Sequence, residues 1–423
     1  MVLEALSILL LLSVTIILGY VGSLIFERTK IPDVIWLMLL GLLLGPVFHL
    51  FPIDVFTGIS SLMAALALII ILYDAGLNMD FYDMIKEVPR GTLLAVMNVA
   101  IAALFVAFIS MFLFKFSLMQ GLLMGVLLGG TSSEIIIVTM RGLNVRPNVR
   151  MLIDLESVLN DPFTIVTSLA LIQMMISGAA FETTINGILG AFSIAIVVGS
   201  IAGMIWLGIL DKLKGRPFDY MLTLAMIFVL YVFTEYVHGS GALSVLAFGI
   251  VLGNAKTFSE MFRMNKVFTV DELLKKFNSE ITFAIRSFFF VYMGLIATIN
   301  PEYALYGLAI SSILILARYI ATNIGLLKSS LSGFESNITS VMGPRGLATA
   351  VLSQLPLIFG LPGAEIYSNI AFIVILSTVI YTAAMTSFLS KRAGKHVQEV
   401  QLAPVVQPPV SEKKKPIRSK PKK

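Results

Sequence analysis

The stretch Leu155-Glu156-Ser157-Val158-Leu159-Asn160-Asp161-Pro162 places two carboxylates and an asparagine inside a largely apolar segment that is long enough to span a membrane. Each charged side chain at the centre of a bilayer costs at least about 2.5–3.5 kcal/mol on insertion scales, so such groups persist where they pair or line a path for a polar substrate. The stretch therefore indicates a membrane protein with a buried functional site.

The composition of the chain also indicates a membrane protein. Hydrophobic residues make up 57% of the 423 residues and charged residues 13%, whereas about 25% of the residues in soluble domains are charged. The chain contains no cysteine, which excludes disulfides, thiol chemistry and cysteine-metal sites. The first apolar segment follows no basic region and shows no small-residue cleavage pattern, so we expect a retained helix.

Windows of about 20 residues predict an all-α polytopic protein with about thirteen transmembrane helices. With the N-terminus outside, the cytoplasmic loops and tail hold most of the 30 Lys and Arg residues, so we predict an external N-terminus and a cytoplasmic C-terminus. The predicted spans lie near 5–26, 33–52, 57–77, 92–114, 118–140, 148–175, 184–210, 219–237, 240–256, 278–298, 303–327, 338–359 and 363–390.

Two spans contain residues that interrupt a helix. Gly129-Gly130-Thr131-Ser132-Ser133 interrupts the fifth span and Gly343-Pro344-Arg345-Gly346 the twelfth, because glycine and proline weaken the helical hydrogen-bond ladder. Such a pair in oppositely oriented halves is typical of inverted repeats whose broken helices cross at the membrane midplane. The alternative is that these glycines only let neighbouring helices pack closely.

Depth along the helices brings polar residues of these spans to similar levels. Asp161 and Thr131 each lie about 20 Å from the membrane surface at which their span begins, which is the middle of the bilayer. Glu156 and three arginines lie about 8–13 Å from the cytoplasmic side, so a buried acid can meet a buried base. The sequence does not show which arginine pairs with Glu156, and the candidates are Arg286, Arg318 and Arg345.

Helical periodicity divides the polar side chains of the sixth span between two stripes. Ser157 and Asp161 share one stripe, and Glu156 and Asn160 share the other. Asp161 and Ser157 can then offer oxygen atoms to one ligand while Glu156 turns toward an arginine. Oxygen ligands without cysteine or a membrane-centre histidine suit a hard cation, and a proton and a cation would compete for the Asp161 carboxylate. The alternative is that Asp161 is a structural, hydrogen-bonded acid.

These residues resemble a known family. Glu156-Ser157-Val158-Leu159-Asn160-Asp161 is similar to the signature of the monovalent cation:proton antiporter superfamily, in particular the NhaP-type sodium/proton antiporters related to sodium/hydrogen exchangers. The stretches at 41–46, 73–77 and 343–346 resemble that family's motifs in the second, third and twelfth helices. The resemblance covers essentially residues 5–390.

The resemblance implies a transporter and not an enzyme, working as a homodimer in the cell membrane with an elevator-like movement. The implied substrates are H⁺ and Na⁺, with K⁺ or Li⁺ as alternatives, exchanged one for one without net charge transfer. We also expect contact with membrane lipid, no cofactor and no nucleic acid partner. The dimerisation part would comprise about 1–80 and 219–298, the core transport part about 90–175 and 303–390, and the linking helix 184–210.

Carried over residue by residue, the resemblance makes Asp161 the carboxylate that binds the monovalent metal cation and the proton. An asparagine beside it, in place of a second aspartate, is similar to the electroneutral branch of the family. Around Asp161 the resemblance places Asn160 as its support, Ser157 and the Thr131 backbone as coordinating groups, and Glu156 paired with Arg345 beside a second core arginine, Arg318.

One stretch departs from the family's pattern. Sodium/proton antiporters usually have an aspartate directly after the threonine of the fifth helix, and this chain has Ser132 after Thr131. Glu134 lies two positions later, about 200° round a regular helix, so it does not simply replace the missing acid. The choice between Na⁺ and K⁺ therefore stays open.

Three other acids have two interpretations each. Asp74 can supply the second carboxylate of the site or be a solvated acid at a helix end. Asp154 and Glu134 can guide ions in a cytoplasmic funnel, and Asp154 can equally cap the cytoplasmic end of its helix. The rival functions are a cation channel, a symporter of related fold and an intramembrane aspartyl protease. No pore loop is visible and no Gly-x-Gly-Asp sequence occurs in the chain.

The last segment, 391–423, is basic and proline-rich with no apolar period. This composition predicts a disordered cytoplasmic tail. Its simplest role would be attraction to anionic lipid of the inner leaflet.

Overall fold

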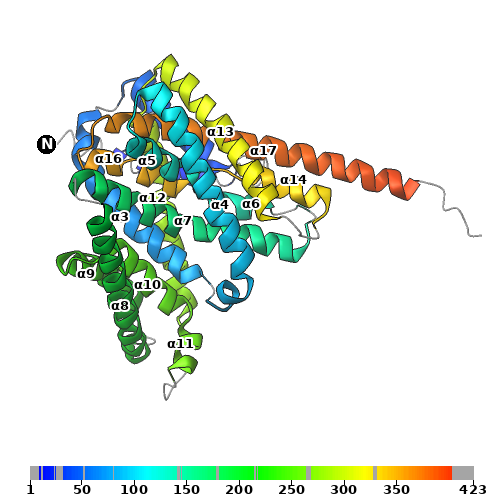
Figure 1. Cartoon of the computed structure of the whole chain (residues 1–423). Helices are drawn as coiled ribbons and strands as arrows, with labels where there is room; N and C mark the ends of the chain where they lie inside the picture. Colours follow the sequence, from blue (N-terminus) through cyan, green and yellow to red (C-terminus); the bar gives the residue numbers. More distant parts are fainter. Residues whose placement is uncertain are drawn as a thin grey trace, which may run out of the picture.

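The computed structural model describes residues 9–10, 13–22, 24, 32–50, 53–79, 81–140, 143, 145–177, 181–213, 216, 218–262, 268–326 and 331–402. This part of the chain is almost entirely helical and contains no strand (Figure 1). The elements are α2 (Asp33–Leu42), the π-helix η1 (Leu43–Val47), α3 (Ile53–Asn78), α4 (Phe81–Phe114), α5 (Leu118–Gly129), α6 (Ser133–Met140), α7 (Pro147–Ser177), α8 (Phe181–Leu213), α9 (Asp219–Tyr236), α10 (Gly241–Gly253), α11 (Ala255–Met261), α12 (Glu272–Ile296), α13 (Pro301–Gly325), α14 (Gly333–Val341), α15 (Leu347–Leu352), α16 (Leu355–Ile358) and α17 (Ala364–Leu402).

Many of these helices are suited to a membrane. Within the described residues, seven helices are long and apolar enough to cross a bilayer, and the pair α10 and α11, bent by 83°, would be an eighth. The prediction of an all-α, multi-pass membrane protein is confirmed, whereas the count of thirteen spans stays a prediction. Shorter apolar helices lie at Ser13–Gly22, Asp33–Val47, Ala65–Asn78, Tyr220–Tyr236 and Leu347–Ile358.

Both helix breaks that the sequence predicts are present. α5 ends at Gly129, Gly130 is extended with φ −68° and ψ 144°, and α6 begins at Ser133. α14 ends at Val341 and α15 begins at Leu347. The fifth and twelfth spans are therefore each built from two half-helices.

The first half-helix of each broken span starts with the same local device. Ser117 caps α5 and Ser332 caps α14, and each serine forms a capping box with the residue three positions later, Gln120 or Glu335. A capping box satisfies two backbone N–H groups at a helix start and fixes where the helix begins. The two broken spans thus share a capped beginning and an interrupted middle.

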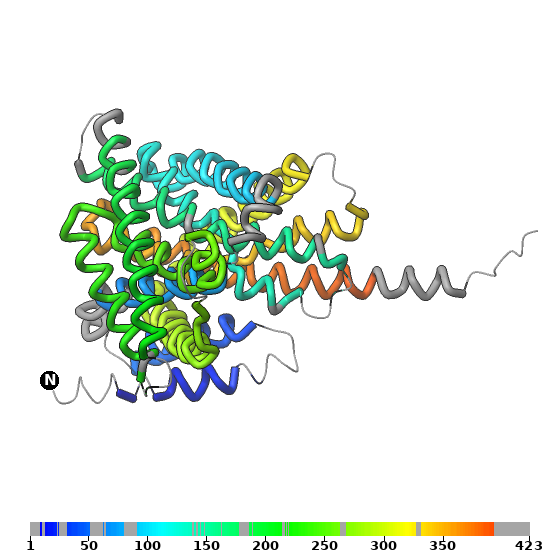
Figure 2. Tube along the Cα trace, turned by 90° about the horizontal axis from the view of Figure 1, so that it is seen from below, coloured from blue at the N-terminus to red at the C-terminus, as the bar shows by residue number. Residues whose placement is uncertain are grey.

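The helices pack in two groups. In the first group, α10 packs against α3, α8, α9 and α11, and α12 packs against α2 and α3. In the second group, α4 packs against α5, α7 and α13, α7 packs against α6, and α13 packs against α14 and α17. Figure 1 shows α8, α9 and α10 on one side of the molecule and α4, α13, α14 and α17 on the other, and Figure 2 shows the same division from below.

Buried apolar side chains follow the same division. One cluster lies within the first group and includes Tyr73, Trp206, Leu230, Phe248 and Leu274. A smaller cluster joins α6, α7 and α14 of the second group, with Ile136, Met140, Val149, Ile153, Ile338 and Met342. The largest cluster contains side chains of both groups, so the groups share an apolar interface. The roles predicted for these two parts stay predictions.

The motif at 41–46 is explained by close packing of α2 on α12. A Cβ added to Gly41 would lie 2.0 Å from the carbonyl oxygen of Val291, so only glycine allows this approach. Pro46 lies inside η1, and a proline has no backbone N–H for the regular helical ladder. The motif therefore serves the packing and the irregular end of this helix.

The last helix is longer than the sequence predicts. α17 continues to Leu402, so residues 391–402 are helical where a disordered tail is expected. This segment contains Lys, Arg, Ala, Gln and Glu, which are good helix formers, and extending an existing helix needs no new nucleation. Residues 403–423 lie outside the described residues.

Candidate functional site

The two helix breaks lie directly against each other. The backbone N–H of Ser132 donates to the carbonyl oxygen of Pro344 at 2.8 Å. A Cβ added to Gly346 would lie 2.3 Å from Oγ of Ser132 and 2.5 Å from its Cβ, so glycine is required at this contact. The crossing brings the inner ends of α5, α6, α14 and α15 to one place.

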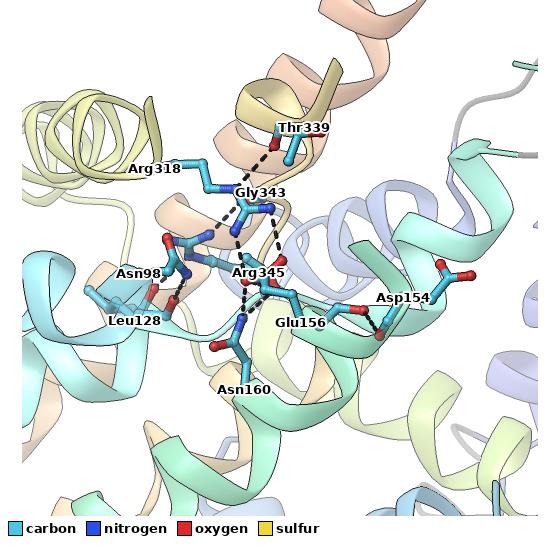
Figure 3. Close-up of polar contacts among 12 residues, drawn as sticks. Asn98, Leu128, Asp154, Glu156, Asn160, Arg318, Thr339, Gly343 and Arg345 are labelled. Atoms are coloured by element: carbon cyan, nitrogen blue, oxygen red, sulfur yellow. Dashed lines mark hydrogen bonds and ion pairs between the residues drawn. The ribbon is translucent and has the colours of Figure 1, made fainter. Parts of the chain in front are cut away.

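Arg318 on α13 holds the buried acid of the α7 motif. Its Nη1 donates to Oε1 of Glu156 at 2.7 Å and its Nη2 to Oε2 at 2.8 Å (Figure 3). The side chain of Arg318 is 1% exposed and that of Glu156 is fully buried. Two parallel charge-assisted bonds of this kind are the geometry in which a buried pair offsets its desolvation. Nε of Arg318 also donates to the carbonyl of Thr339 at 3.3 Å, in the last turn of α14.

The pairing of Glu156 with Arg345 that the resemblance implies is wrong in this structure. Arg345 instead donates from Nε to the carbonyl of Leu128 at 2.6 Å and from Nη1 to the carbonyl of Gly343 at 2.7 Å. The last turn of α5 has carbonyl groups without helical partners and carries partial negative charge. Arg345 therefore caps the broken helix, and this need explains its position (Figure 3).

Asn98 on α4 shares the capping of α5 and was not predicted. Its Nδ2 donates to the carbonyl of Gly129 at 3.0 Å, and its side chain is fully buried. The available signal was weak, because it consists of one asparagine inside an apolar span. Figure 3 shows Asn98 beside Leu128 and Arg345 at the end of α5.

Asn160 and Thr131 extend the Glu156 network to the break in the fifth span. Nδ2 of Asn160 donates to Oε1 of Glu156 at 2.5 Å and to Oγ1 of Thr131 at 2.7 Å. Oγ1 of Thr131 donates to Oε1 of Glu156 at 3.4 Å, and all three side chains are buried. The structure thus joins α7, the α5–α6 break and α13 through one neutralised carboxylate.

Asp161 lies one position beyond this network and faces a cavity. Within the described residues, its carboxylate has no hydrogen-bond or ion-pair partner, whereas its backbone carbonyl accepts from Oγ1 of Thr164 at 3.0 Å. Thr131, Ser132 and Gly346 also line this cavity. The carboxylate therefore lies at the helix crossing, and no protein group in the described part of the chain binds it.

A larger cavity continues from Asp161 to the loop that follows α6. By the predicted topology this loop is cytoplasmic. Asp154 and Glu134, the two acids predicted for a cytoplasmic funnel, both line this cavity. Other lining residues are Asp74, Asn78, Leu143, Val145, Arg150 and Val158.

Asp74 reaches the same space from the first helix group. Its Oδ1 accepts from Nδ2 of Asn278 at 2.5 Å and from Nδ2 of Asn78 at 3.1 Å. Asp74 and Asp161 both line the two cavities, so the space lies between the two groups. Asn278 was not predicted, because its contact with α3 depends on tertiary packing.

No group of three His, Asp or Glu side chains suited to a resident metal occurs in the described part of the chain.

The structure does not bring Ser157 to these cavities. Its hydroxyl donates to the carbonyl of Asp154 at 2.9 Å, its side chain is fully buried, and it lines neither cavity. Helical periodicity predicts Ser157 on the same face as Asp161. A serine hydroxyl can donate its hydrogen bond to a carbonyl of the preceding turn of its own helix. Because the Ser157 hydroxyl does so, it does not face the cavity beside Asp161.

Glu134 pairs with Arg286, the third arginine of the predicted spans. Its Oε2 accepts from Nη1 of Arg286 at 2.7 Å, and Oδ2 of Asp33 accepts from Nη2 of the same arginine at 3.1 Å. Arg286 is therefore not the partner of Glu156. Neither its pairing nor the position of Asp33 was predicted, since the three residues lie on three different helices.

Comparison with known proteins agrees with this architecture. The chain matches the family described as sodium/hydrogen exchanger, transmembrane, over residues 12–392. The chain belongs to the sodium/hydrogen exchanger family. This membership confirms the predicted resemblance to the monovalent cation:proton antiporter superfamily.

Individual relatives of this exchanger-family chain are distant. The K(+)/H(+) antiporter NhaP2 of Shewanella baltica is 28% identical over 89% of this chain and 65% of the relative. The probable Na(+)/H(+) antiporter 2 of Methanocaldococcus jannaschii is 26% identical over 81% of this chain and 85% of the relative. The chain thus spans 65% of the length of the Shewanella relative.

A solved structure shows the same fold. The sodium proton antiporter MjNhaP1 from Methanocaldococcus jannaschii aligns over 92% of this chain and 99% of that chain. The TM-score is 0.79 and the sequence identity is 23%.

Proposed function

We propose that this chain exchanges a monovalent cation for H⁺ across the membrane, with both ions binding in turn at Asp161. The observation that carries the proposal is the Asp161 carboxylate, which meets a cavity at the helix crossing and has no partner among the described residues. The neighbouring acids are engaged, since Glu156 pairs with Arg318 and Glu134 pairs with Arg286. Exchange requires one site that either ion can fill, and Asp161 supplies it.

The same contacts support electroneutral exchange. Arg318 compensates the charge of Glu156, and Asn160 is neutral, so Asp161 is the one uncompensated carboxylate in the α7 motif. One bound monovalent cation would therefore replace one proton. A one-for-one exchange moves no net charge across the membrane.

The packing supports an elevator-like movement in a homodimer. The cavities lie between the first group, which carries Asp74, and the second group, which carries Asp161. A displacement of the second group along the first would carry Asp161 from one membrane face to the other. The first group would form the dimer contact, and the connection between α6 and α7 would face the cytoplasm, with the N-terminus outside.

We propose Na⁺ as the transported cation, which agrees with the name of the probable Na(+)/H(+) antiporter 2 of Methanocaldococcus jannaschii, with K⁺ as the second candidate. Ser132 favours K⁺, because a neutral hydroxyl stands where sodium/proton antiporters usually have a carboxylate. A site with fewer charged ligands has a weaker field and discriminates less against the larger, more easily dehydrated ion. The name of the Shewanella relative also refers to K⁺.

Liposomes that contain the purified protein test the proposal. A preset pH gradient is monitored with a pH-sensitive dye while Na⁺, K⁺ or Li⁺ is added outside. Cation-dependent collapse of the gradient is expected, and the ion that acts at the lowest concentration identifies the substrate. A Na⁺ response that is unchanged when valinomycin and K⁺ clamp the voltage supports electroneutral exchange. A folded protein that responds to none of these cations would contradict the proposal.

A further inference from the structure

Arg286 on α12 binds two acids that belong to different helix groups. Its Nη1 lies 2.7 Å from Oε2 of Glu134 on α6, which is part of the second group. Its Nη2 lies 3.1 Å from Oδ2 of Asp33 on α2, which packs with α12 in the first group. One guanidinium therefore makes one ion pair within a group and one between the groups.

This cluster is only partly open to solvent. The side chain of Arg286 is 20% exposed, that of Asp33 is 17% exposed and that of Glu134 is 34% exposed. The guanidinium also lies 5.6 Å from the centre of the Phe283 ring, one turn earlier on α12. Partly buried pairs are screened by salt less than pairs at the surface, and the ring limits the positions that the guanidinium can take.

The location of Glu134 connects the cluster to the ion path. Glu134 lies in the first turn of α6, directly after the helix break, and lines both cavities that contain Asp161. The ion pair Arg286–Glu134 joins the two groups. The ion pairs Arg318–Glu156 and Arg146–Glu335 each lie within the second group. A movement of α6 along α12 would have to separate Glu134 from Arg286 and would leave Arg286 with Asp33.

We propose that Arg286 is a positioning residue that latches α6 to α12 through Glu134 and so favours the arrangement in which the larger cavity reaches Asp161. Asp33 keeps Arg286 in place on the first group when the latch opens. The relative movement of the groups belongs to the proposed function, but accessibility of the cavity can be measured without any transport.

The chain contains no cysteine, so one introduced cysteine reports accessibility without background. Val158 lines the larger cavity on the same helix as Asp161, and Val158→Cys is the reporter. Membranes that contain the full chain are given a short pulse of a water-soluble maleimide. The labelled-to-protected ratio is then measured, in which protected protein is the protein whose introduced cysteine has not reacted. Glu134→Gln is the test variant, and Asp33→Asn is the matched control, because it removes the pair within the first group.

Glu134→Gln is expected to lower the labelled-to-protected ratio about two- to fivefold, the range that loss of a partly exposed ion pair gives in a two-state equilibrium. Arg286→Gln should lower it similarly, and Arg286→Lys, which keeps the charge, should restore much of it. Asp33→Asn should leave the ratio near that of the reporter alone. An unchanged ratio in Glu134→Gln, or an equal decrease in Asp33→Asn, would overturn the latch.

If Arg286→Gln does not fold, Glu134→Gln and Asp33→Asn still decide the question. The outcome is also separate from that of the proposed function. A loss of exchange in liposomes with the labelling pattern intact would contradict antiport and leave the latch standing. The expected exchange with an unchanged labelling ratio would contradict the latch alone.

Discussion

The backbone N–H of Ser132 and the carbonyl oxygen of Pro344 are 2.8 Å apart, so each helix break satisfies a polar group of the other. Backbone groups that cannot bind water in a membrane need partners inside the protein. A single broken helix would leave such groups without partners at the centre of the molecule. Two breaks in contact solve this problem for both spans, which explains why the interrupted segments occur as a pair.

Gly346→Ala should destabilise the protein through this contact. The added Cβ would lie 2.3 Å from Oγ of Ser132 and 2.5 Å from its Cβ, so the backbone of one break has to move. Overpacking of this kind costs about 1–3 kcal/mol. Thermal unfolding of the detergent-solubilised protein measures the effect. Gly333→Ala is the control, because no atom lies within 4 Å of a Cβ at Gly333. Equal melting temperatures for the two variants would show that the breaks are not tightly packed.

Glu156→Gln should destabilise the protein because it leaves Arg318 buried without a counter-charge. The pair is at most 1% exposed and is bound through both carboxylate oxygens. Removing one partner of a buried ion pair typically costs about 3–5 kcal/mol. The double variant Glu156→Gln with Arg318→Met should recover part of the loss, since it no longer contains an isolated buried charge.

The melting temperatures of the detergent-solubilised variants measure these effects. Glu280→Gln is a suitable control, because Glu280 is exposed on α12. Its melting temperature should stay close to that of the unchanged protein. If Glu156→Gln has the same melting temperature as Glu280→Gln, the ion pair does not stabilise the fold. If the double variant is less stable than Glu156→Gln, the cost does not come from the isolated arginine.

The two helix breaks and the position of Asp161 beside them were readable from the sequence for a physical reason. Glycine, proline and charged side chains have large energetic consequences inside apolar spans, so their positions mark a site without any knowledge of packing. Gly129–Ser133 and the stretch at 343–346 are such positions, and the structure breaks both helices there.

The partner of Glu156 was not readable in the same way. Depth along a helix places residues to within about a turn, and three arginines lie within that uncertainty. Their actual partners depend on tertiary packing, since Arg318 meets Glu156, Arg345 meets the end of α5, and Arg286 meets α2 and α6. The pattern of residues along the sequence does not show which helix end has carbonyl groups that need a hydrogen-bond donor from another helix.

Stability should depend on pH through Glu335, at the start of α14. Nε of Arg146 donates to Oε1 of Glu335 at 2.6 Å, and this bond is the largest cause that lowers the pKa of Glu335 from 4.5 to about 2. A carboxyl with a lower pKa in the folded state binds a proton more weakly when folded. Its stabilising contribution is therefore present above pH 4.5 and is lost as the pH falls toward 2.

The melting temperatures of the unchanged protein and Glu335→Gln should consequently differ most above about pH 5 and converge as the pH falls to about 2. Scanning calorimetry or dye-monitored unfolding over this range gives the difference directly. Arg146→Gln should show the same convergence, because it removes the other partner. A difference that stays constant across the range would mean that the ion pair does not contribute to stability.

Asp161→Asn should abolish exchange without lowering stability. Asparagine is nearly the same size, and the carboxylate it replaces has no partner to lose among the described residues. Removing an unpaired charge from a partly buried position breaks no contact of the described fold, so the melting temperature should be equal or higher. In the liposome assay, cation-dependent collapse of the pH gradient should fall to the level of protein-free liposomes. Asp154→Asn, in the same cavity, should slow exchange and leave it measurable. Retained exchange in Asp161→Asn would contradict the site, because a neutral amide cannot exchange a proton for a cation.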